Sequence, residues 1–458
     1  MRRISGMKIK VIYPTRLGPA GKPVKTKARH GRAVNLSMIY LAGITPKEHE
    51  VEVIDDLFED PDYDEPVDLV GLSAMTMQAP RAYQIAKEYR KRGVKVVMGG
   101  FHASFMPNEA GENVDAVVIG EAELSWPQLL RDAEKGQLKR IYQSPRLENL
   151  QGLPPPRYDL IAQKPYKYSF YPLWVGRGCP HHCKFCSVTN LYGRQLRTRP
   201  LQDVEHDASL VANQRIFIVD DNLFAYGKFL YELFPILARY KLKWTAQADP
   251  RFADDDFLLD LARETGMEAA YIGFENFYPD RLQSMDKEWA RIENYGRLIE
   301  KIHRRGIAVQ ASMIFGITRE SKQSIRETLK CLEDWQVDGL ALYIFTPVPG
   351  CELYDEFLKN GTNLPKDWSA YDGNHAVYVP EGMTREELEE LYWELYSSFF
   401  SYPSIIKRFA RVPYGPKMWA RYLAGSVLVN HVDMRLRRSV FDNYVSFREL
   451  IPGYSALK

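Results

Sequence analysis

The sequence predicts an α/β protein of two parallel sheets followed by a mostly helical region. Strand-like and helix-like segments alternate through the first third of the chain and again through its middle, which is typical of parallel strands joined by helices. A proline-rich stretch separates these two parts. We therefore expect a doubly wound sheet in residues 1–140, a linker in 141–172, an open partial (β/α)6 barrel in 173–365 and a helical C-terminal cap in 366–458.

The first sheet is predicted from five short apolar runs. Strands are expected at 8–13, 51–55, 69–73, 94–98 and 114–119, with helices at 34–44 and 80–92. Ligands of doubly wound sheets bind at the loops beyond the carboxyl ends of the strands. In this Rossmann-like part, the loops expected to bind a ligand are 14–32, 73–80, 99–107 and 120–124.

Two of these loops suit a large ligand. Ser73 ends a strand with a hydroxyl group, and Gly99-Gly100 lets the backbone approach a ligand closely because glycine has no side chain. Loop glycines also occur by default in sheets of this kind, so ordinary loop residues are the alternative interpretation.

The second sheet is predicted from six further strands. They are expected at 173–178, 215–219, 244–248, 269–274, 308–316 and 339–345. Asp221 and Asn222 follow the second of them, Gln247 stands near the end of the third, and Glu275 follows the fourth. A binding site at the carboxyl face of a barrel needs polar residues at these points. For each residue alone, a solvated strand end is the alternative.

Three cysteines lie close together after the first barrel strand. Cys179, Cys183 and Cys186 have the spacing C-x3-C-x2-C, and no fourth cysteine is near. A structural zinc site or a fully ligated iron–sulfur cluster takes four protein ligands. Three thiolates on a [4Fe–4S] cluster leave one iron open to a substrate or cofactor. Zinc with His181 or His182 is the alternative, although a residue between such close cysteines is poorly placed to complete a tetrahedron.

This motif, with Phe185 before the third cysteine, resembles the signature of the radical S-adenosylmethionine (SAM) enzymes. The resemblance covers nearly the whole chain and implies one [4Fe–4S] cluster on the three cysteines, with SAM at its open iron. The implied SAM-binding residues are Asp221, Asn222, Gln247, Glu275 and Ile314. Asp221-Asn222 replaces the glycine-rich GGE turn that many members carry, which is a departure from the general pattern.

The region before the cysteines resembles the B12-binding-type domain that precedes the radical SAM core in a large subfamily. The implied cobalamin-binding residues are Ser73, Gly99, Gly100, His102, Gly120 and Glu121. The D-x-H-x-x-G motif that supplies a lower histidine ligand to cobalt is missing after the first strand, and His30-Gly31 lacks the aspartate. We therefore expect cobalamin without a histidine ligand. A domain that binds no cobalamin is the alternative.

The composition favours a cytoplasmic enzyme. A net charge of +2 over 458 residues gives no general attraction for nucleic acid. The chain shows no signal peptide, and no apolar run is long enough to span a membrane. Five cysteines are a sparse, odd count, as expected in a reducing compartment, and Cys331 and Cys351 suit small buried hydrophobes.

The C-terminal region changes from acidic to basic. Residues 384–400 have helical periodicity and begin with the capping box Thr384-Arg385-Glu386-Glu387. Residues 401–438 carry eight Lys or Arg and one acid. A basic amphipathic helix can lie on an anionic membrane surface, so peripheral membrane contact is one expectation. A helical cap over the barrel is the other.

The resemblance implies an enzyme that cleaves SAM reductively to a 5′-deoxyadenosyl radical and, with cobalamin, methylates an unactivated carbon of a small-molecule or lipid-like substrate. It also implies an external electron donor such as flavodoxin or ferredoxin. A cobalamin-independent cyclisation, oxidation or heteroatom insertion is the alternative on the same fold. A non-catalytic iron–sulfur redox protein is the alternative of a different class. No motif identifies the substrate, and the residues that act on it stay unknown.

Overall fold

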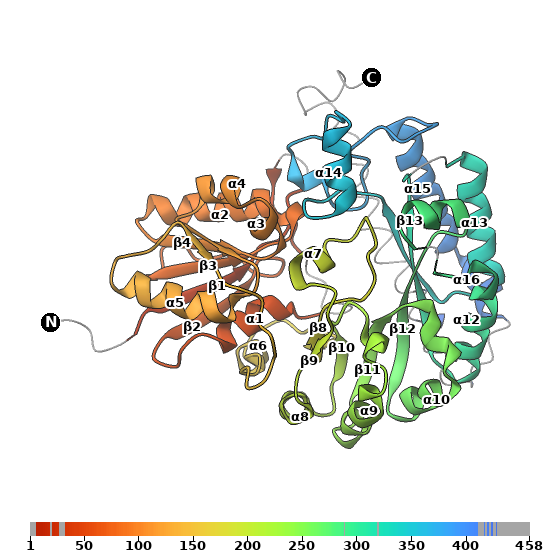
Figure 1. Cartoon of the computed structure of the whole chain (residues 1–458), viewed down its shortest axis with the longest axis horizontal. Helices are drawn as coiled ribbons and strands as arrows, with labels where there is room; N and C mark the ends of the chain where they lie inside the picture. Colours follow the sequence, from red (N-terminus) through yellow and green to blue (C-terminus); the bar gives the residue numbers. More distant parts are fainter. Residues whose placement is uncertain are drawn as a thin grey trace.

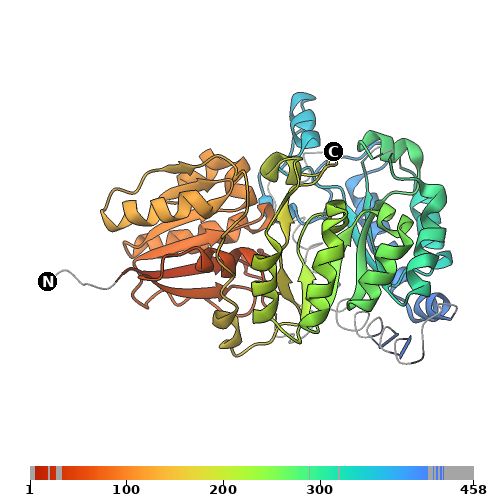
Figure 2. The same cartoon turned by 60° about the horizontal axis from the view of Figure 1, so that its bottom comes forward.

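Two parallel sheets lie side by side in the computed structural model, the N-terminal sheet on the left of Figure 1 and the barrel on the right. The structure describes residues 6–18, 21–26, 33–287, 289–317 and 320–410, and beyond these positions 416, 419–420, 423–424 and 427. Figure 2 shows helices of the barrel on its outer side, away from the N-terminal sheet.

The N-terminal sheet has six parallel strands in the order β2-β1-β3-β4-β5-β6. They are β1 (Lys8–Tyr13), β2 (Glu50–Asp55), β3 (Leu69–Ser73), β4 (Lys95–Gly99), β5 (Ala116–Ile119) and β6 (Ile141–Gln143). The strand order reverses beside β1, which creates the crevice where doubly wound sheets bind ligands. The predicted sheet is confirmed, with one addition: β6 falls within the predicted linker and pairs with β5.

The second sheet also has six parallel strands, in the order β14-β13-β12-β11-β10-β7, as predicted for an open partial barrel. They are β7 (Tyr171–Leu173), β10 (Arg215–Ile218), β11 (Lys243–Ala248), β12 (Met267–Glu275), β13 (Ala308–Phe315) and β14 (Gly339–Ile344). Two further short strands, β8 (Gly176–Arg177) and β9 (Arg197–Thr198), pair antiparallel outside this sheet.

The prediction of one continuous strand over 173–178 is wrong. Only Leu173 of that segment belongs to the barrel sheet, and the chain then leaves the sheet before β8. The reason is that the side chain of Asp220, which follows β10, accepts hydrogen bonds from the backbone N–H groups of Val175 and Gly176 at 2.9 and 2.6 Å. Those N–H groups are therefore satisfied by a carboxylate instead of a neighbouring strand.

Helices cover both sheets. The α-helices are α1 (Leu36–Gly43), α2 (Ala79–Lys91), α3 (Phe101–Phe105), α4 (Pro107–Asn113), α5 (Ala122–Glu134), α6 (Tyr158–Ala162), α7 (Val188–Tyr192), α8 (Leu201–Leu210), α9 (Phe229–Arg239), α10 (Asp256–Glu264), α11 (Pro279–Ser284), α12 (Tyr295–Arg304), α13 (Lys322–Asp334), α14 (Glu352–Lys359), α15 (Arg385–Phe399) and α16 (Tyr402–Phe409). Short 3-10 turns are η2 (Thr76–Gln78), η3 (Leu223–Tyr226), η4 (Pro250–Asp254), η5 (Ile292–Asn294) and η6 (Trp368–Ala370).

One apolar core runs from the N-terminal sheet into the barrel, and Tyr40 and Trp174 meet edge to face at 5.3 Å within it.

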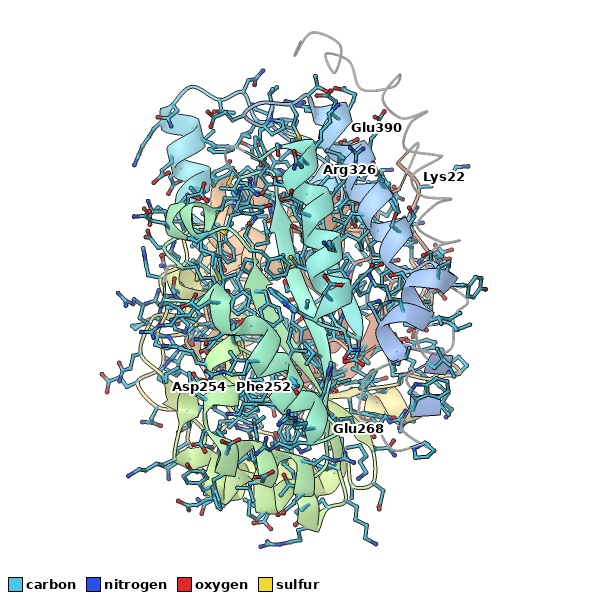
Figure 3. The ribbon with its side chains drawn as sticks, turned by 90° about the vertical axis from the view of Figure 1, so that its right-hand side faces the viewer. Lys22, Phe252, Asp254, Glu268, Arg326 and Glu390 are labelled. Atoms are coloured by element: carbon cyan, nitrogen blue, oxygen red, sulfur yellow. The ribbon has the colours of Figure 1, made fainter. Side chains whose placement is uncertain are left out.

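The C-terminal helices pack on the outside of the barrel. Helix α15 begins at the predicted capping box, with Thr384 Oγ1 accepting from Glu387 N–H at 3.1 Å. Figure 3 shows α15 beside α13, where Arg326 donates to Glu394 at 2.9 Å. Arg408 of α16 is fully buried and donates to the carbonyl of Phe399 at 2.9 Å, so part of the basic stretch serves the fold.

Most of the remaining basic stretch, and with it the expectation of membrane contact, lies outside the described residues. Among the helices that the structure does describe, none is both long enough and apolar enough to cross a membrane.

Candidate cofactor pocket and cluster loop

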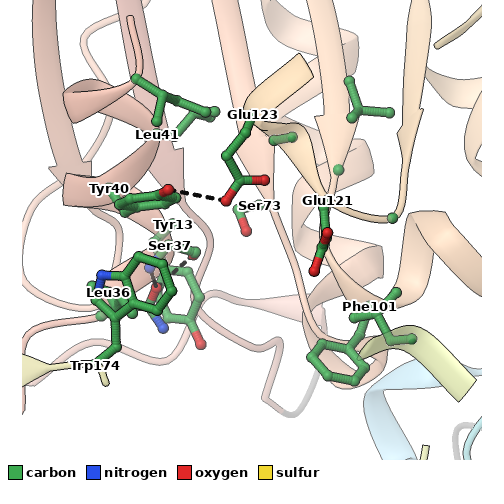
Figure 4. Close-up of a pocket in the computed structure, with 18 of the residues that line it drawn as sticks. Tyr13, Leu36, Ser37, Tyr40, Leu41, Ser73, Phe101, Glu121, Glu123 and Trp174 are labelled. Carbon is green, nitrogen blue, oxygen red and sulfur yellow. Dashed lines mark hydrogen bonds between the residues drawn. The ribbon is translucent and has the colours of Figure 1, made fainter. Parts of the chain in front are cut away.

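A cavity of about 390 Å³ lies between the carboxyl edge of the N-terminal sheet and the first segments of the barrel part (Figure 4). We call it the interdomain pocket. Six residues predicted to bind cofactors line it: Ser73, Gly99, Gly100, Gly120, Glu121 and Asp221. The barrel side contributes Trp174, Gly176, Arg177, Leu191, Tyr192, Val219 and Asp220 as well. The structure therefore brings the loops of both domains to one cavity.

One wall of the interdomain pocket is apolar. Side chains that contribute to it are Leu41, Ile44, Val97, Val118 and Trp126. Trp126 is buried, and its indole N–H donates to Thr45 Oγ1 at 2.9 Å, which fixes the orientation of the ring. The pocket thus offers a preformed surface for an aromatic or aliphatic group.

Gly100 is required by the protein's own backbone. Its φ is +92°, and a Cβ atom there would lie 2.9 Å from the carbonyl oxygen of Ala74. The close approach expected at this position is therefore already made by the end of β3. At Gly99 the nearest neighbour of an added Cβ is Val118 at 3.6 Å, an ordinary contact. Gly99 is thus the position where a side chain would take up pocket space without a backbone clash.

Four charged side chains form a buried network where the two domains meet: Glu121 and Glu123 at the start of α5, and Arg177 and Arg197 from β8 and β9. Arg177 donates to Glu123 Oε1 at 2.5 Å, and Arg197 donates to Glu121 at 2.7 and 3.1 Å. Burial opposes ionisation of Glu121, but the hydrogen bonds from Arg197 and the charge of Arg177 outweigh it and lower its pKa. The guanidinium group of Arg177 also faces the ring of Trp174 at 4.9 Å.

The three cysteines lie on the loop between β8 and α7. All three are free thiols, and burial raises their pKa values, that of Cys183 to about 11. The charges of Cys179 and Cys183 further raise the pKa of Cys186, so the three side chains lie within electrostatic range of one another. Across the described ranges of the chain, no three His, Cys, Asp or Glu side chains are arranged around a single metal ion.

The cluster loop starts from a tightly packed backbone. Gly178, directly before the first cysteine, has a φ of +97°, and a Cβ atom there would lie 2.2 Å from the carbonyl oxygen of Gln195. Cys179 N–H donates to the carbonyl of Gly193 at 3.3 Å. The position of the first thiol is therefore set by the segment that returns from α7 to β9.

His181 is held by side chains instead of facing the cysteines as a ligand. Its Nε2 lies 3.2 Å from Asp249 Oδ2, and its ring stacks on Trp289 with 4.0 Å between centroids. Asp249 also accepts from Asn222 at 2.8 Å and from Arg251 at 3.1 Å. Burial opposes ionisation of Asp249, yet these donors outweigh it and lower its pKa. The network ties the cluster loop to the ends of β10 and β11.

Glu275 ends β12 with a left-handed backbone, φ +63°. Its Oε1 accepts from Lys287 at 2.7 Å, and its Oε2 lies 3.4 Å from Ser312 Oγ. A positive φ at a residue other than glycine costs about 1–3 kcal/mol, and such strain often occurs at functional sites. Glu275, one of the predicted SAM-binding residues, has one oxygen in an internal ion pair and the other beside a hydroxyl group.

Two adjacent carboxyl groups follow β10. Burial raises the pKa of Asp220 to about 6, although its hydrogen bonds from Val175 and Gly176 oppose the shift. Burial and the charge of Asp220 raise the pKa of Asp221 to about 7. Gln247 Nε2 lies 3.5 Å from the carbonyl oxygen of Asp220. Of these predicted SAM residues, Asp221 lines the interdomain pocket, and Gln247 lies beside the neighbouring Asp220.

A second cavity of about 280 Å³ opens at the ends of β13 and β14, beside the cluster loop. We call it the aromatic slot. It is lined by Met75, Thr76, Met77, Phe101, Phe185, Ser187, Ile314, Tyr343, Ile344, Phe345, Thr346, Val348, Pro349, Tyr371, Asp372 and Gly373. Asp372 is already paired with Arg16 at 2.5 Å. The slot contains the predicted Ile314 and the aromatic residue of the cysteine motif.

His102 lines neither cavity. It is fully buried, its Nε2 lies 2.9 Å from Tyr83 Oη, and its ring meets Trp368 edge to face at 5.4 Å. The predicted cofactor residue therefore lies in the packing between α2, α3 and η6.

Sequence reasoning missed several residues of the interdomain pocket, among them Tyr40, Trp126, Trp174 and Arg177, whereas Glu123 falls within the predicted ligand loop 120–124. Trp174 and Arg177 directly precede the cysteine motif, and this position could have marked them. Tyr40 and Trp126 lie within helices, where an aromatic residue resembles ordinary core. Their role depends on which helix face meets the second domain, and no local pattern reports that.

The residues present fit the groups that the motifs imply. Three thiols on one loop suit a cluster, whose positive charge would favour their ionised form. The interdomain pocket combines an apolar wall with polar groups at its rim. One buried atom there, Glu123 Oε2, has no hydrogen-bond partner, and a donor on a bound molecule would satisfy it.

Two family models match the chain: the B12 binding domain over residues 27–130 and the Radical SAM superfamily over residues 175–332. A curated relative, bacteriochlorophyllide d C-12(1)-methyltransferase of Chlorobaculum tepidum, is 28% identical over 389 residues, which make up 82% of this chain and 85% of the relative.

Two solved structures share the fold. The radical SAM methyltransferase TsrM from Kitasatospora setae, with cobalamin and a [4Fe–4S] cluster bound, matches with a TM-score of 0.62 and 16% identity, over 85% of this chain and 89% of that chain. The cobalamin-dependent SAM radical enzyme OxsB, with aqua-cobalamin and SAM bound, matches with a TM-score of 0.68 and 14% identity, over 97% of this chain and 75% of that chain.

Proposed function

We propose that this chain, which belongs to the radical SAM superfamily and carries a B12-binding domain ahead of its radical SAM core, transfers a methyl group from cobalamin to an unactivated carbon of a small organic substrate. The interdomain pocket is the observation that carries the proposal. Arg177 and Tyr192 both line it, and the three cysteines lie between them in the chain. A cofactor in this pocket would therefore adjoin the cluster loop.

When bound, the cluster and SAM would supply hydrogen-atom removal, and cobalamin would supply methyl delivery. In the overall reaction, R–H, two SAM molecules and two electrons give R–CH3, 5′-deoxyadenosine, methionine and S-adenosylhomocysteine. The electrons come from a flavodoxin- or ferredoxin-like donor. The protein's own contribution is to bind these groups, orient them and exclude water.

Five side chains are proposed to hold SAM. The aromatic slot, with Phe185 and Ile314, suits a flat and uncharged adenine ring. Glu275 Oε2 can accept from a ribose hydroxyl, because only its other oxygen is paired with a lysine. Asn222, whose Oδ1 is buried without a hydrogen-bond partner, and Gln247 are proposed to contact the polar amino-acid part of SAM at the ends of β10 and β11.

The interdomain pocket is proposed to hold cobalamin through two kinds of contact. The apolar wall at Trp126 suits the aromatic base of the nucleotide tail, and Ser73, Gly99 and Gly120 offer backbone and hydroxyl groups along it. A cobalt without a histidine ligand stays a prediction, because His30 lies outside the described residues. Replacing His30 with alanine should leave the cobalt spectrum unchanged.

The test is anaerobic reconstitution of the full chain with iron, sulfide and hydroxocobalamin, followed by desalting. We expect the protein to retain both a cluster and cobalamin, and to form 5′-deoxyadenosine and S-adenosylhomocysteine from SAM after reduction. A first substrate to add is bacteriochlorophyllide d, on which the 28% identical relative acts.

Other outcomes of this test separate the alternatives. Formation of 5′-deoxyadenosine by protein that retains no cobalamin would contradict methyl transfer and favour another radical reaction on the same fold. A stable cluster without any SAM cleavage would indicate an iron–sulfur redox protein.

A further inference from the structure

Glu123 occupies an unusual position at the start of α5. Its Oε1 accepts from Tyr40 Oη at 3.0 Å and from Arg177 at 2.5 Å. Its Oε2 is buried and has no hydrogen-bond partner. Figure 4 shows one oxygen bound by Tyr40 and the other pointing away from it. Because a buried carboxylate oxygen without a donor is costly, a ligand donor is the natural complement to it.

Arg177 offers the matching donor. Its Nη1 is buried without forming a hydrogen bond, although it lies 3.2 Å from Glu121 Oε1. Its other contacts, with Glu123 and with the rings of Trp174 and Tyr192, hold the guanidinium group in one orientation. One unpaired acceptor and one unpaired donor therefore belong to two bonded side chains that both line the interdomain pocket.

The charges of this network restrict the ligand group that fits. Glu121 and Glu123 are matched by Arg177 and Arg197, so the formal charges cancel. A phosphate would gain no net attraction there. A neutral group that carries both a donor and an acceptor would satisfy both orphaned atoms, and a primary amide is such a group.

We propose that Glu123 and Arg177 bind one side-chain amide of the corrin ring, Glu123 Oε2 accepting from the amide N–H and Arg177 Nη1 donating to the amide carbonyl. The inference rests on the proposed binding of cobalamin in the interdomain pocket. It gives the corrin a contact where α5 meets β8, distinct from the apolar wall at Trp126.

Cobalamin derivatives provide the test. Dissociation constants of the full chain are measured for cyanocobalamin, for cobinamide, which lacks the nucleotide tail, and for the separately purified monocarboxylic acids, in which one amide has become a carboxylate. We expect one monocarboxylic acid to bind at least tenfold more weakly than cyanocobalamin, since it places a second carboxylate against Glu123.

The Glu123→Gln variant should change this preference in a specific way. Cyanocobalamin and cobinamide should both bind about tenfold more weakly, because a charged acceptor is lost. The disfavoured monocarboxylic acid should now bind at least as tightly as cyanocobalamin, since glutamine can donate to its carboxylate. The matched control is Glu109→Gln, which removes a carboxylate that bonds Tyr83 and Trp368 and does not line the pocket.

Three results would overturn the inference. The first is that wild-type protein binds cyanocobalamin and every monocarboxylic acid with equal affinity. The second is that Glu123→Gln keeps the wild-type preference for cyanocobalamin over the monocarboxylic acid, and the third is that Glu123→Gln weakens binding of cyanocobalamin but not of cobinamide. Each would show that the pair serves the fold or contacts the tail. If wild-type protein binds no cobalamin derivative at all, the proposed function itself fails, and this result is distinct from the others.

Discussion

The two sheets of this protein carry binding sites at the same kind of edge, yet they prepare those edges differently. The N-terminal edge borders a preformed cavity of about 390 Å³ with an apolar wall. At the barrel edge the polar residues are already bonded to one another, as in the pairs Glu275–Lys287 and Asp249–Asn222. The first edge can bind by filling space, whereas at the second edge the polar groups of a ligand must compete with internal partners such as Lys287 and Asp249.

Electrostatics separates the two edges as well. At the N-terminal edge, arginines lower the pKa of Glu121 against the effect of burial. At the barrel edge, burial raises the pKa of Asp221 and of Glu320 to about 7, whereas hydrogen-bond donors outweigh burial at Asp249 and lower its pKa. Ionisation of Glu121 therefore favours the folded state at higher pH, whereas ionisation of Asp221 and Glu320 disfavours it.

The largest expected effect is the loss of the cluster. Replacing Cys179, Cys183 or Cys186 with alanine should abolish cluster binding and SAM cleavage, because three ligands leave no spare thiolate. The control is Cys331→Ala, a free cysteine on α13 outside the loop. Iron content and 5′-deoxyadenosine formation check the prediction, and retained cleavage in Cys183→Ala would contradict it.

Breaking the buried network of Glu121, Glu123, Arg177 and Arg197 should give the next largest effect, a loss of folding stability. Arg177→Met leaves Glu123 without its charged partner, and we expect the free energy of unfolding to fall by about 3–5 kcal/mol. The exposed pair Arg326–Glu394 is the control, and Arg326→Met should cost at most about 1 kcal/mol. Denaturant unfolding of the full chain measures both. Equal effects would show that the domain interface does not depend on this network.

The pH dependence of stability should expose the barrel edge. Burial raises the pKa of Glu320 from 4.5 to about 7 in the folded protein. Because folding raises the pKa of Glu320, this group's contribution to the free energy of unfolding is fully present below pH 4.5, the pKa in the unfolded chain. The contribution is lost as pH rises through about 7, the pKa in the folded protein. Glu320→Gln should remove this loss, on the order of 3 kcal/mol between pH 4.5 and 8.

The control for this pH series is Glu390→Gln, which removes an exposed carboxyl group of α15. Its unfolding midpoint should follow the wild-type pH profile. If the free energy of unfolding of Glu320→Gln falls with pH as steeply as that of the wild-type protein, Glu320 is not the group that causes the loss of stability.

The smallest expected effect concerns SAM. Glu275→Gln removes a charged acceptor from the barrel edge, so SAM affinity should fall about ten- to a hundredfold while the cluster spectrum is kept. Glu268→Gln, on the same strand at its other end, should leave the affinity unchanged. A titration of reconstituted protein with SAM measures both, and an equal affinity in Glu275→Gln would assign the ribose contact to another residue.

The sequence predicted the fold well because its signals are local. Apolar runs such as 8–13 and 69–73 match strands of the structure, and the capping box at Thr384 starts α15. The strand expected over 173–178 failed because a distant side chain, Asp220, captures its N–H groups. Local patterns carry no information about such a partner.

The candidate site was predictable only in part. Strand-end residues such as Ser73 and Asp221 follow from the topology, since parallel strands end at one edge. The partner that occupies a side chain does not follow from it. Lys287 pairs with Glu275, and Trp174 lines the pocket, yet both are contributed by segments whose placement depends on the packing of helices and domains.

The most direct test of the account asks whether the two metal cofactors share one site. Protein loaded with the reduced cluster and with Co(II) cobalamin is compared by electron paramagnetic resonance with protein that carries either one alone. The account predicts a spin–spin interaction that broadens or splits both signals in the doubly loaded sample, because the interdomain pocket adjoins the cluster loop. A spectrum that equals the sum of the two single ones would contradict it.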